Sequence, residues 1–383
     1  MRICIAYDCL FPWTIGGAER WYRNLAERLS QEGHEVTYIT RRQWPAGAPP
    51  QLPGVRVVVV SRAEPLYGPD GNRTIGEPLR YGWGTLGHLL RHGRDYDIVH
   101  MASFPYFSVL AAATARPLGR YALVVDWHEL WSASYWDEYL GGVKGRLGHA
   151  VQHACARVRH RAFCFSRLHR DRLLAEGFRG EVTVLPGEYA GTLQAPEPNE
   201  ARLVAVFAGR HIAEKRADAL VPAVMRARAA IPGLRAVIFG DGPRRQDVLE
   251  AIDACSAHGI VEAPGFVDAA EVDAALRDAL CMVLPSSREG YGMVVVEAAA
   301  RGTPSVVVAG EDNAAVELVD EGRNGTVAAS AAPQELAAAI ERVHRAGPQM
   351  RAATCAWFER NATRLSLEQS LQQVVASYYR DRG

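Results

Sequence analysis

Two glutamates flank a glycine-rich loop between Leu284 and Glu297, and this segment carries the clearest chemistry in the sequence. A strand is predicted to end at Leu284, Glu289 follows in the loop, and a helix opens near Gly292 with Glu297 in its second turn. The start of a helix offers unpaired N–H groups, and glycines let an anion approach the backbone. An anionic ligand centred there would meet a carboxylate on each side, suited to sugar hydroxyls. This arrangement has the shape of a site for a nucleotide diphosphate sugar, although the segment taken alone favours its alternative, a capped helix with solvated glutamates.

A basic pair follows the predicted strand Leu203 to Ala208. Arg210 lies in the next loop and Lys215 at a helix start, and Lys215 is one of only two lysines among 43 basic residues. Two fixed cations could neutralise a diphosphate leaving group without a divalent metal, so neither a metal nor a cofactor is expected. The alternative is a solvated run of charges around Lys215.

In the first half, His128 lies just past a predicted strand end, where a side chain can reach a ligand. Its neighbours Trp127, Glu129 and Trp131 are candidates for contact with an acceptor molecule. Aromatic residues recur at every fourth position from Trp127 to Tyr139, which as a helical stripe indicates core packing or an acceptor wall equally. His100 also ends a strand, where a structural role is the favoured interpretation.

Gly16 and Gly17 open a predicted helix after the first strand. A dinucleotide-binding fingerprint is a poor rival there, because the spacing is not G-x-G-x-x-G and no acidic residue ends the second strand. Arg41 and Arg42 could suit a phosphorylated ribose, so this rival is weakened and stays open.

These side chains are predicted to be positioned by strands that alternate with helices, which indicates parallel sheets built from strand-helix-strand units. The predicted strands are Ile3 to Tyr7, Glu35 to Thr40, Val55 to Val60, Asp97 to Met101, Tyr121 to Val125, Ala162 to Phe165, Val182 to Leu185, Leu203 to Ala208, Leu234 to Phe239, Ile260 to Ala263, Leu280 to Leu284 and Ser305 to Val308. Only helical patterning follows Pro333.

The pattern predicts two Rossmann-like α/β domains, residues 1–188 and 202–358, joined by a linker at 189–201 that has prolines, glycines and no apolar periodicity. Residues 359–383 are predicted to form a helix that returns to the first domain. Since ligands of open α/β sheets bind outside the carboxyl ends of the strands, a cleft between the two sheets is the expected site.

Five motifs in order resemble the retaining glycosyltransferases of family 4, which have the GT-B fold. They are Gly209-Arg210 with Lys215, then Gly240-Asp241-Gly242-Pro243, Gly265-Phe266-Val267, Glu289 to Glu297, and Gly302-Thr303-Pro304. The resemblance is specific in the second half and looser, though compatible, in the first.

The resemblance implies that Arg210 and Lys215 hold the donor diphosphate, that Glu297 binds the ribose and that Glu289 lies against the transferred sugar. Further donor contacts are implied for Gly290, Tyr291, Gly292, Met293 and Val294, with Phe266 and Val267 lining the base. Gly16 and Gly17 resemble the loop that covers the donor phosphate and faces the acceptor, and His128 resembles a histidine that binds the donor sugar and helps position the acceptor.

Such enzymes are thought to react on one face of the sugar, with the leaving phosphate oxygen taking the acceptor proton. Arg210, Lys215 and helix dipoles would stabilise the developing charge. Glu289 is then a positioning and electrostatic residue, and its use as a nucleophile is the minority interpretation.

The stretch from Lys144 to Arg172 is basic and holds four histidines. It has three interpretations: a solvated basic helix face, which is favoured, a peripheral membrane contact, or a metal site from His149 and His153 at i, i+4. The metal site is disfavoured because no carboxylate or third ligand lies near in sequence.

The composition is neutral, with 43 basic and 43 acidic residues, so no general attraction to nucleic acid is expected. The seven cysteines form no C-x-x-C pair and mostly lie in apolar runs, which indicates reduced, buried thiols. No signal peptide and no membrane-spanning stretch are predicted, so the expected location is the cytoplasm, with peripheral membrane contact as the variant.

The leading hypothesis is transfer of a hexose from a nucleotide diphosphate sugar to a small-molecule or glycan acceptor, with natural product (antibiotic) glycosylation favoured. The alternatives are cell-envelope or lipid-linked glycan synthesis at the membrane, a nucleotide-sugar 2-epimerase of the same fold, and a non-catalytic binding protein. Two loops depart from the family pattern, Leu185 to Tyr189 and Gly310 to Asn313, so donor and acceptor preferences cannot be copied from a typical member.

Overall fold

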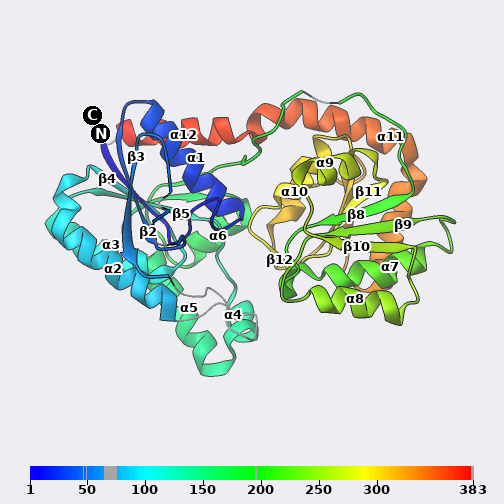
Figure 1. Ribbon diagram of the computed structural model, residues 1–383, viewed down its shortest axis with the longest axis horizontal. Helices are drawn as coiled ribbons and strands as arrows, with labels where there is room; N and C mark the ends of the chain where they lie inside the picture. Colours follow the sequence, from blue (N-terminus) through cyan, green and yellow to red (C-terminus); the bar gives the residue numbers. More distant parts are fainter. Residues whose placement is uncertain (46, 49, 64–75, 195, 381–383) are drawn as a thin grey trace. The chain divides into compact units, whose positions relative to one another are not determined.

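A computed structural model describes residues 1–45, 47–48, 50–63, 76–194 and 196–380 (Figure 1). The chain forms two compact units, Met1–Glu188 with Glu368–Gly383, and Tyr189–Leu367. The predicted linker 189–201, of which residue 195 lies outside the described residues, counts with the second unit. Helix α11 (Pro333–Leu365) belongs to the second unit, and the segment Glu368–Gly383 belongs to the first.

The first unit contains a parallel seven-stranded sheet in the order β3-β2-β1-β4-β5-β6-β7. Its strands are β1 (Arg2–Ala6), β2 (Glu35–Arg41), β3 (Val55–Ser61), β4 (Ile98–Ala102), β5 (Ala122–Trp127), β6 (Arg161–Cys164) and β7 (Val182–Val184). Its helices are α1 (Gly17–Gln31), α2 (Gly76–His92), α3 (Tyr106–Gly119), α4 (Ala133–Leu140), α5 (Gly142–Ala156), α6 (Arg167–Ala175) and α12 (Leu367–Tyr379).

The two faces of this sheet have different coverings, with α2 and α3 on one side and α1 and α12 on the other (Figure 1). Alternate strand residues point to opposite faces. Val99, Met101, Val125 and Trp127 belong to the apolar core shared with α2, α3 and α5. The intervening residues, including the buried His100 and Asp126, therefore face α1 and α12.

The second unit contains a parallel six-stranded sheet in the order β10-β9-β8-β11-β13-β15. Its strands are β8 (Val204–Ala208), β9 (Arg235–Phe239), β10 (Val261–Gly265), β11 (Cys281–Leu284), β13 (Ser305–Val308) and β15 (Gly325–Ala328). In Figure 1, α7 (Leu220–Ala227) and α8 (Arg245–Ala254) lie on one side of the sheet, and α9 (Ala269–Asp278) and α10 (Met293–Ala299) on the other.

The strand order reverses direction between β1 and β4 in the first sheet, and between β8 and β11 in the second. Such a reversal leaves a crevice at the carboxyl ends of the two central strands, because their connections leave toward opposite faces. The predicted two-domain Rossmann-like architecture is confirmed, with every predicted strand present in order.

Among the described residues, the sequence pattern missed three strands. A two-stranded sheet pairs β12 (Arg288–Glu289) with β14 (Asp312–Asn313), and both strands are too short and polar to give an apolar signal. The third, β15, reads Gly-Thr-Val-Ala and is stabilised by pairing along the whole of β13.

All seven cysteines are free thiols, and six of them are buried. Burial raises the pKa of thiols such as Cys4, Cys155 and Cys164, so these side chains behave as small apolar groups. No helix among the described residues combines the length and the hydropathy needed to cross a bilayer.

Candidate functional site

In the second unit, Lys215 and Glu289 meet at the reversal between β8 and β11. The Lys215 ammonium donates to Oε1 of Glu289 over 2.5 Å, and the hydroxyl of Ser286 donates to the same oxygen over 2.7 Å. Glu289 is buried, and Lys215 keeps a fifth of its side chain exposed. Two residues predicted to contact different parts of a donor thus contact each other.

The short β12–β14 sheet holds Glu289 in place. Glu289 pairs with Asn313 across it, and the Asn313 amide donates to the carbonyls of Ser286 and Val308 over 3.1 and 2.8 Å. Asn313 also accepts from the N–H of Ala315. The loop that departs from the family pattern, Gly310 to Asn313, is therefore the support of the glutamate strand.

A second ion pair fixes the same loop to the segment that carries Lys215. The Arg288 guanidinium donates to Glu214 over 2.5 Å, and the N–H of Ser287 donates to the Glu214 carbonyl over 2.8 Å. The charges around Lys215 are thus engaged in contacts, which opposes the alternative of a solvated run.

Three glycines of the motif series are required by close approach of the backbone. A Cβ on Gly240 would lie 1.9 Å from the Gly209 carbonyl oxygen, and a Cβ on Gly242 2.5 Å from the His211 carbonyl oxygen. Gly292 has φ +100° at the start of α10, where a Cβ would lie 2.6 Å from that of Ala315. The first two contacts hold the loops after β8 and β9 together, and the third holds the start of α10 against the segment that follows β14.

The remaining predicted donor residues follow β8, β10 and β11, beyond the carboxyl ends of these strands. Phe266 follows β10 with 74% of its surface exposed, and Val267 is half-buried beside it. Arg210 is exposed after β8, while Glu297 is half-buried in α10. Of the glycine-rich loop and the start of α10, Tyr291 and Gly292 are buried, and Gly290, Met293 and Val294 are half-buried.

In the first unit, His128 follows β5 and stacks on Phe165, with ring centroids 4.2 Å apart. Nδ1 of His128 lies 3.8 Å from Oε1 of Glu188, a residue that follows β7. Burial lowers the pKa of His128 to about 4, although the charge of Asp126 acts in the opposite direction. The imidazole is therefore neutral at physiological pH.

Near His128, a chain of buried polar side chains connects β5 through β4 to the last helix, α12. Nε2 of His100 lies 2.7 Å from Oδ1 of Asp126, and Nδ1 of His100 contacts the hydroxyl of Tyr378 on α12. The Trp21 indole donates to Oδ2 of Asp126 over 2.7 Å. Burial favours the neutral acid, but His100, His128 and Trp21 outweigh it and keep the pKa of Asp126 below its ordinary value.

Gly16 and Gly17 lie at the start of α1, as expected, with Gly16 as its N-cap. A Cβ on Gly16 would collide with the Glu19 carboxylate, and a Cβ on Gly17 would lie 3.9 Å from Oε2 of Glu188. Neither the motifs nor the positions of strand ends predicted Glu188, Ser286 or Asn313 as site residues. For Glu188 and Asn313 the available signal was that their loops depart from the family pattern.

Trp127 is not an acceptor contact, which corrects the prediction. It is fully buried on the opposite face of β5 from Asp126, and its indole contacts Nε2 of His160 at 3.0 Å. The predicted helical stripe is also wrong, since Trp127 ends a strand and helix α4 begins only at Ala133. Trp131 and Glu129 stay half-buried and contact each other through the Trp131 indole, so their predicted role stays a prediction.

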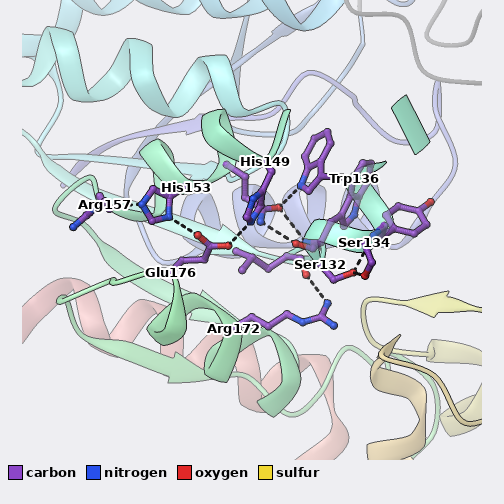
Figure 2. A network of polar contacts seen from close by, with 12 residues as sticks. Ser132, Ser134, Trp136, His149, His153, Arg157, Arg172 and Glu176 are labelled. Atoms are coloured by element: carbon purple, nitrogen blue, oxygen red, sulfur yellow. Dashed lines mark hydrogen bonds and ion pairs between the residues drawn. The ribbon is translucent and has the colours of Figure 1, made fainter. Parts of the chain in front are cut away.

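The basic stretch from Lys144 to Arg172 is not one helix face, because it runs through α5, the buried strand β6 and the start of α6. The carboxylate that the sequence argument lacked is Glu176, which lies between His149 and His153 at 2.9 and 2.5 Å (Figure 2). Both rings point at the carboxylate. Among the described residues, no group of three or more His, Cys, Asp or Glu side chains is arranged to hold a metal ion.

Comparisons with known proteins agree with this architecture. Residues 16–188 match the family model "Glycosyl transferase 4-like domain", and residues 192–356 match "Glycosyl transferases group 1". The glycogen synthase of Mycobacterium tuberculosis is 28% identical, over 90% of this chain and 86% of its own length. An alpha-D-kanosaminyltransferase of Streptomyces kanamyceticus is 29% identical, over 37% of this chain and 36% of its own.

Solved structures show the same fold at low identity. Sucrose-phosphate synthase from Thermosynechococcus elongatus superposes with a TM-score of 0.78 at 18% identity, covering 100% of this chain and 99% of the other. The Anabaena protein HepE, in complex with UDP, gives 0.73 at 18% identity over 98% and 99% of the two chains. With both halves matched by family models and the fold shared along its length, the chain belongs to the GT-B fold glycosyltransferases of the GT4 type.

Proposed function

We propose that this glycosyltransferase retains the anomeric configuration while it moves a hexose from a nucleotide diphosphate sugar to a hydroxyl of a small-molecule or glycan acceptor. The bond between the anomeric carbon and the phosphate oxygen breaks, and a bond to the acceptor oxygen forms on the same face of the sugar. The acceptor proton passes to the leaving phosphate oxygen. No divalent cation takes part.

The observation that carries this proposal is the Lys215–Glu289 contact at the reversal between β8 and β11. When a diphosphate arrives, Lys215 can exchange one anionic partner for another, because part of its side chain is exposed. Arg210 adds a second cation after the same strand. Fixed cations aimed at the leaving group stabilise the charge that develops there.

The sugar and the base have separate supports. Glu289, freed from Lys215, keeps Ser286 as its donor and accepts hydrogen bonds from the transferred hexose. Phe266 offers an exposed ring on which a base can stack, and Glu297 accepts from the ribose. Support for UDP comes from HepE, which was crystallised with UDP and with UDP-glucose.

For the acceptor, we propose natural product glycosylation. The supporting similarities are the alpha-D-kanosaminyltransferase and a 2-deoxystreptamine N-acetyl-D-glucosaminyltransferase of Niallia circulans, which is 31% identical over 26% of each chain. The half-buried Trp131, with Glu129 beside it, is the aromatic face proposed for the acceptor.

The test is nucleotide release from UDP-, GDP-, ADP- and dTDP-sugars, with and without EDTA and a panel of acceptors. We expect release that EDTA does not abolish and a product with the anomeric configuration of the donor, assigned by NMR. Lys215→Ala should lower kcat by about 10²-fold or more. The control is Lys144→Ala, which removes the other lysine, exposed on α5.

The outcomes separate the alternatives. Donor conversion without an acceptor would indicate a nucleotide-sugar 2-epimerase, and binding without turnover or hydrolysis a non-catalytic protein. A Lys215→Ala variant with kcat within a few-fold of the parent would remove Lys215 from the leaving-group role.

A second candidate acceptor is a lipid-linked glycan at a membrane surface. Helix α5 exposes Val143 and Leu147 by 80% and 65%, next to the exposed cations Lys144 and Arg146. Apolar side chains among cations suit the interface of an anionic membrane. Co-sedimentation with phosphatidylglycerol vesicles, lost in the Val143→Asp/Leu147→Asp double variant, would favour this candidate over a soluble acceptor.

A further inference from the structure

Glu188 is the last residue of the segment Met1–Glu188 of the first unit. It follows β7 at the carboxyl edge of the sheet, with His128 after β5 and Gly17 after β1 as neighbours. The parallel strands bring these three residues to one edge, where ligands of open α/β sheets bind. No role for Glu188 follows from the motif series, because its loop departs from the family pattern.

The Glu188 carboxyl is buried without a full set of partners. Its side chain is 8% exposed, and Oε1 has no hydrogen-bond partner, since Nδ1 of His128 at 3.8 Å is too far for one. Nε2 of His128 is also buried without a partner. A buried polar atom without a hydrogen bond costs about 1–3 kcal/mol. Two such atoms on neighbouring side chains indicate that a ligand supplies the hydrogen bonds that they lack.

The charge states of Glu188 and His128 indicate which kind of ligand would fit them. Burial, followed by the charge of Asp126, raises the pKa of Glu188 to about 8, and burial lowers that of His128 to about 4. At neutral pH the pair is therefore a carboxylic acid beside a neutral imidazole. Each group can both donate and accept a hydrogen bond, which matches hydroxyl groups better than an anion or a cation.

We propose that Glu188 binds hydroxyl groups of an acceptor sugar ring next to His128, and so helps determine which acceptor the first unit takes. The proposal rests on the proposed function for the identity of the ligand as a sugar. It makes Glu188 a binding residue: no proton transfer or covalent step is assigned to it.

The experiment uses the full chain labelled with ¹³Cδ-glutamate and ¹⁵N-histidine. The signals of Glu188 and His128 are assigned by their loss in Glu188→Gln and His128→Gln. The probes are the methyl α-glycosides of glucose, galactose, mannose and N-acetylglucosamine. We expect at least one glycoside to shift both signals saturably. Glu188→Leu should then weaken that glycoside about tenfold or more at His128, whereas Glu188→Gln, which still donates and accepts, should stay within a few-fold.

The matched control is Glu181→Gln, the same change at a partly exposed glutamate of the same unit. If no glycoside moves the Glu188 signal, or if Glu188→Leu binds as tightly as the parent, the proposal is wrong. If Glu188→Leu does not fold, the test is whether a glycoside shifts the Glu188 signal of the parent saturably. UDP binding, measured by calorimetry, reports on the second unit separately, so failure of the proposed function would appear there and not in the glycoside titration.

Discussion

His100 and Asp126 form a hydrogen-bonded pair in which neither residue has exposed surface, with Nε2 of His100 2.7 Å from Oδ1 of Asp126. Neighbouring strands β4 and β5 supply the two residues on the face that α1 and α12 cover. The remaining nitrogen of His100 is engaged by Tyr378. The Asp126 carboxylate is thus held near His128 by a hydrogen-bonded chain to which β4, β5 and α12 each contribute a residue.

Tyr378→Phe should destabilise the first unit by about 1–3 kcal/mol, because it leaves Nδ1 of the buried His100 without a partner. Urea unfolding measures the change. Tyr379→Phe is the control, since the hydroxyl of this half-exposed neighbour contacts His34 at the surface. Its effect should stay within about 0.5 kcal/mol. Equal unfolding midpoints for the two variants would contradict the role of the buried chain.

Stability should depend on pH through Glu188. Between its ordinary pKa of 4.5 and the folded value of about 8, the folded chain keeps a proton that the unfolded chain has lost. Stability therefore falls as pH rises through this window, by at most about 1.4 kcal/mol per pH unit. The free energy of unfolding of the parent, minus that of Glu188→Gln, should decrease from pH 5 to pH 8 and level off above.

His128 titrates in another window and in the opposite sense. Its pKa falls from 6.5 to about 4 on folding, so stability rises from pH 4 to pH 6.5. That contribution is common to the parent and to Glu188→Gln, and it cancels in their difference. A flat Glu188→Gln difference over the whole range would show that the buried carboxyl of Glu188 titrates normally.

Gly292→Ala should destabilise the second unit. The added Cβ must tolerate a left-handed backbone and would lie 2.6 Å from Cβ of Ala315. Gly322→Ala is the matched control, because its φ of +77° is also left-handed while no atom lies within 4 Å of the added Cβ. We expect a cost of about 1 kcal/mol for Gly322→Ala and about 1–3 kcal/mol more for Gly292→Ala, measured by urea unfolding. Equal costs would show that the contact with Ala315 relaxes freely.

Phe266→Ala should weaken UDP binding by about tenfold or more, since stacking of a base on an aromatic ring contributes about 1–3 kcal/mol. The unfolding midpoint should not change, because the ring is mostly exposed. Calorimetry with UDP measures the affinity, and Trp83→Ala removes an equally exposed ring from the first unit as a control. Unchanged affinity would place the base elsewhere.

The fold was predictable because short apolar strands alternate with helical patterns along the chain. The second-unit loops were predictable because Gly240, Gly242 and Gly292 must be glycine for steric reasons. Contacts between side chains of segments that are distant in sequence could not be predicted. The contact of Lys215 with Glu289 depends on two loops far apart in sequence, and β12 and β14 are too short to leave a pattern. For Trp127 the sequence pattern was misleading. The spacing of the aromatic residues suggested a helix, but Trp127 ends a strand and belongs to the core.

The contact of Tyr378 with His100 also has a consequence for biosynthesis. His100 and Asp126 leave the ribosome early, but the hydroxyl that completes their chain belongs to a helix synthesised after the whole second unit. A nascent chain that stops short of Tyr378 can pair the strands of the first unit but cannot finish the polar chain beneath His128. This part of the first unit can therefore reach its final hydrogen bonding only after α12 has been synthesised.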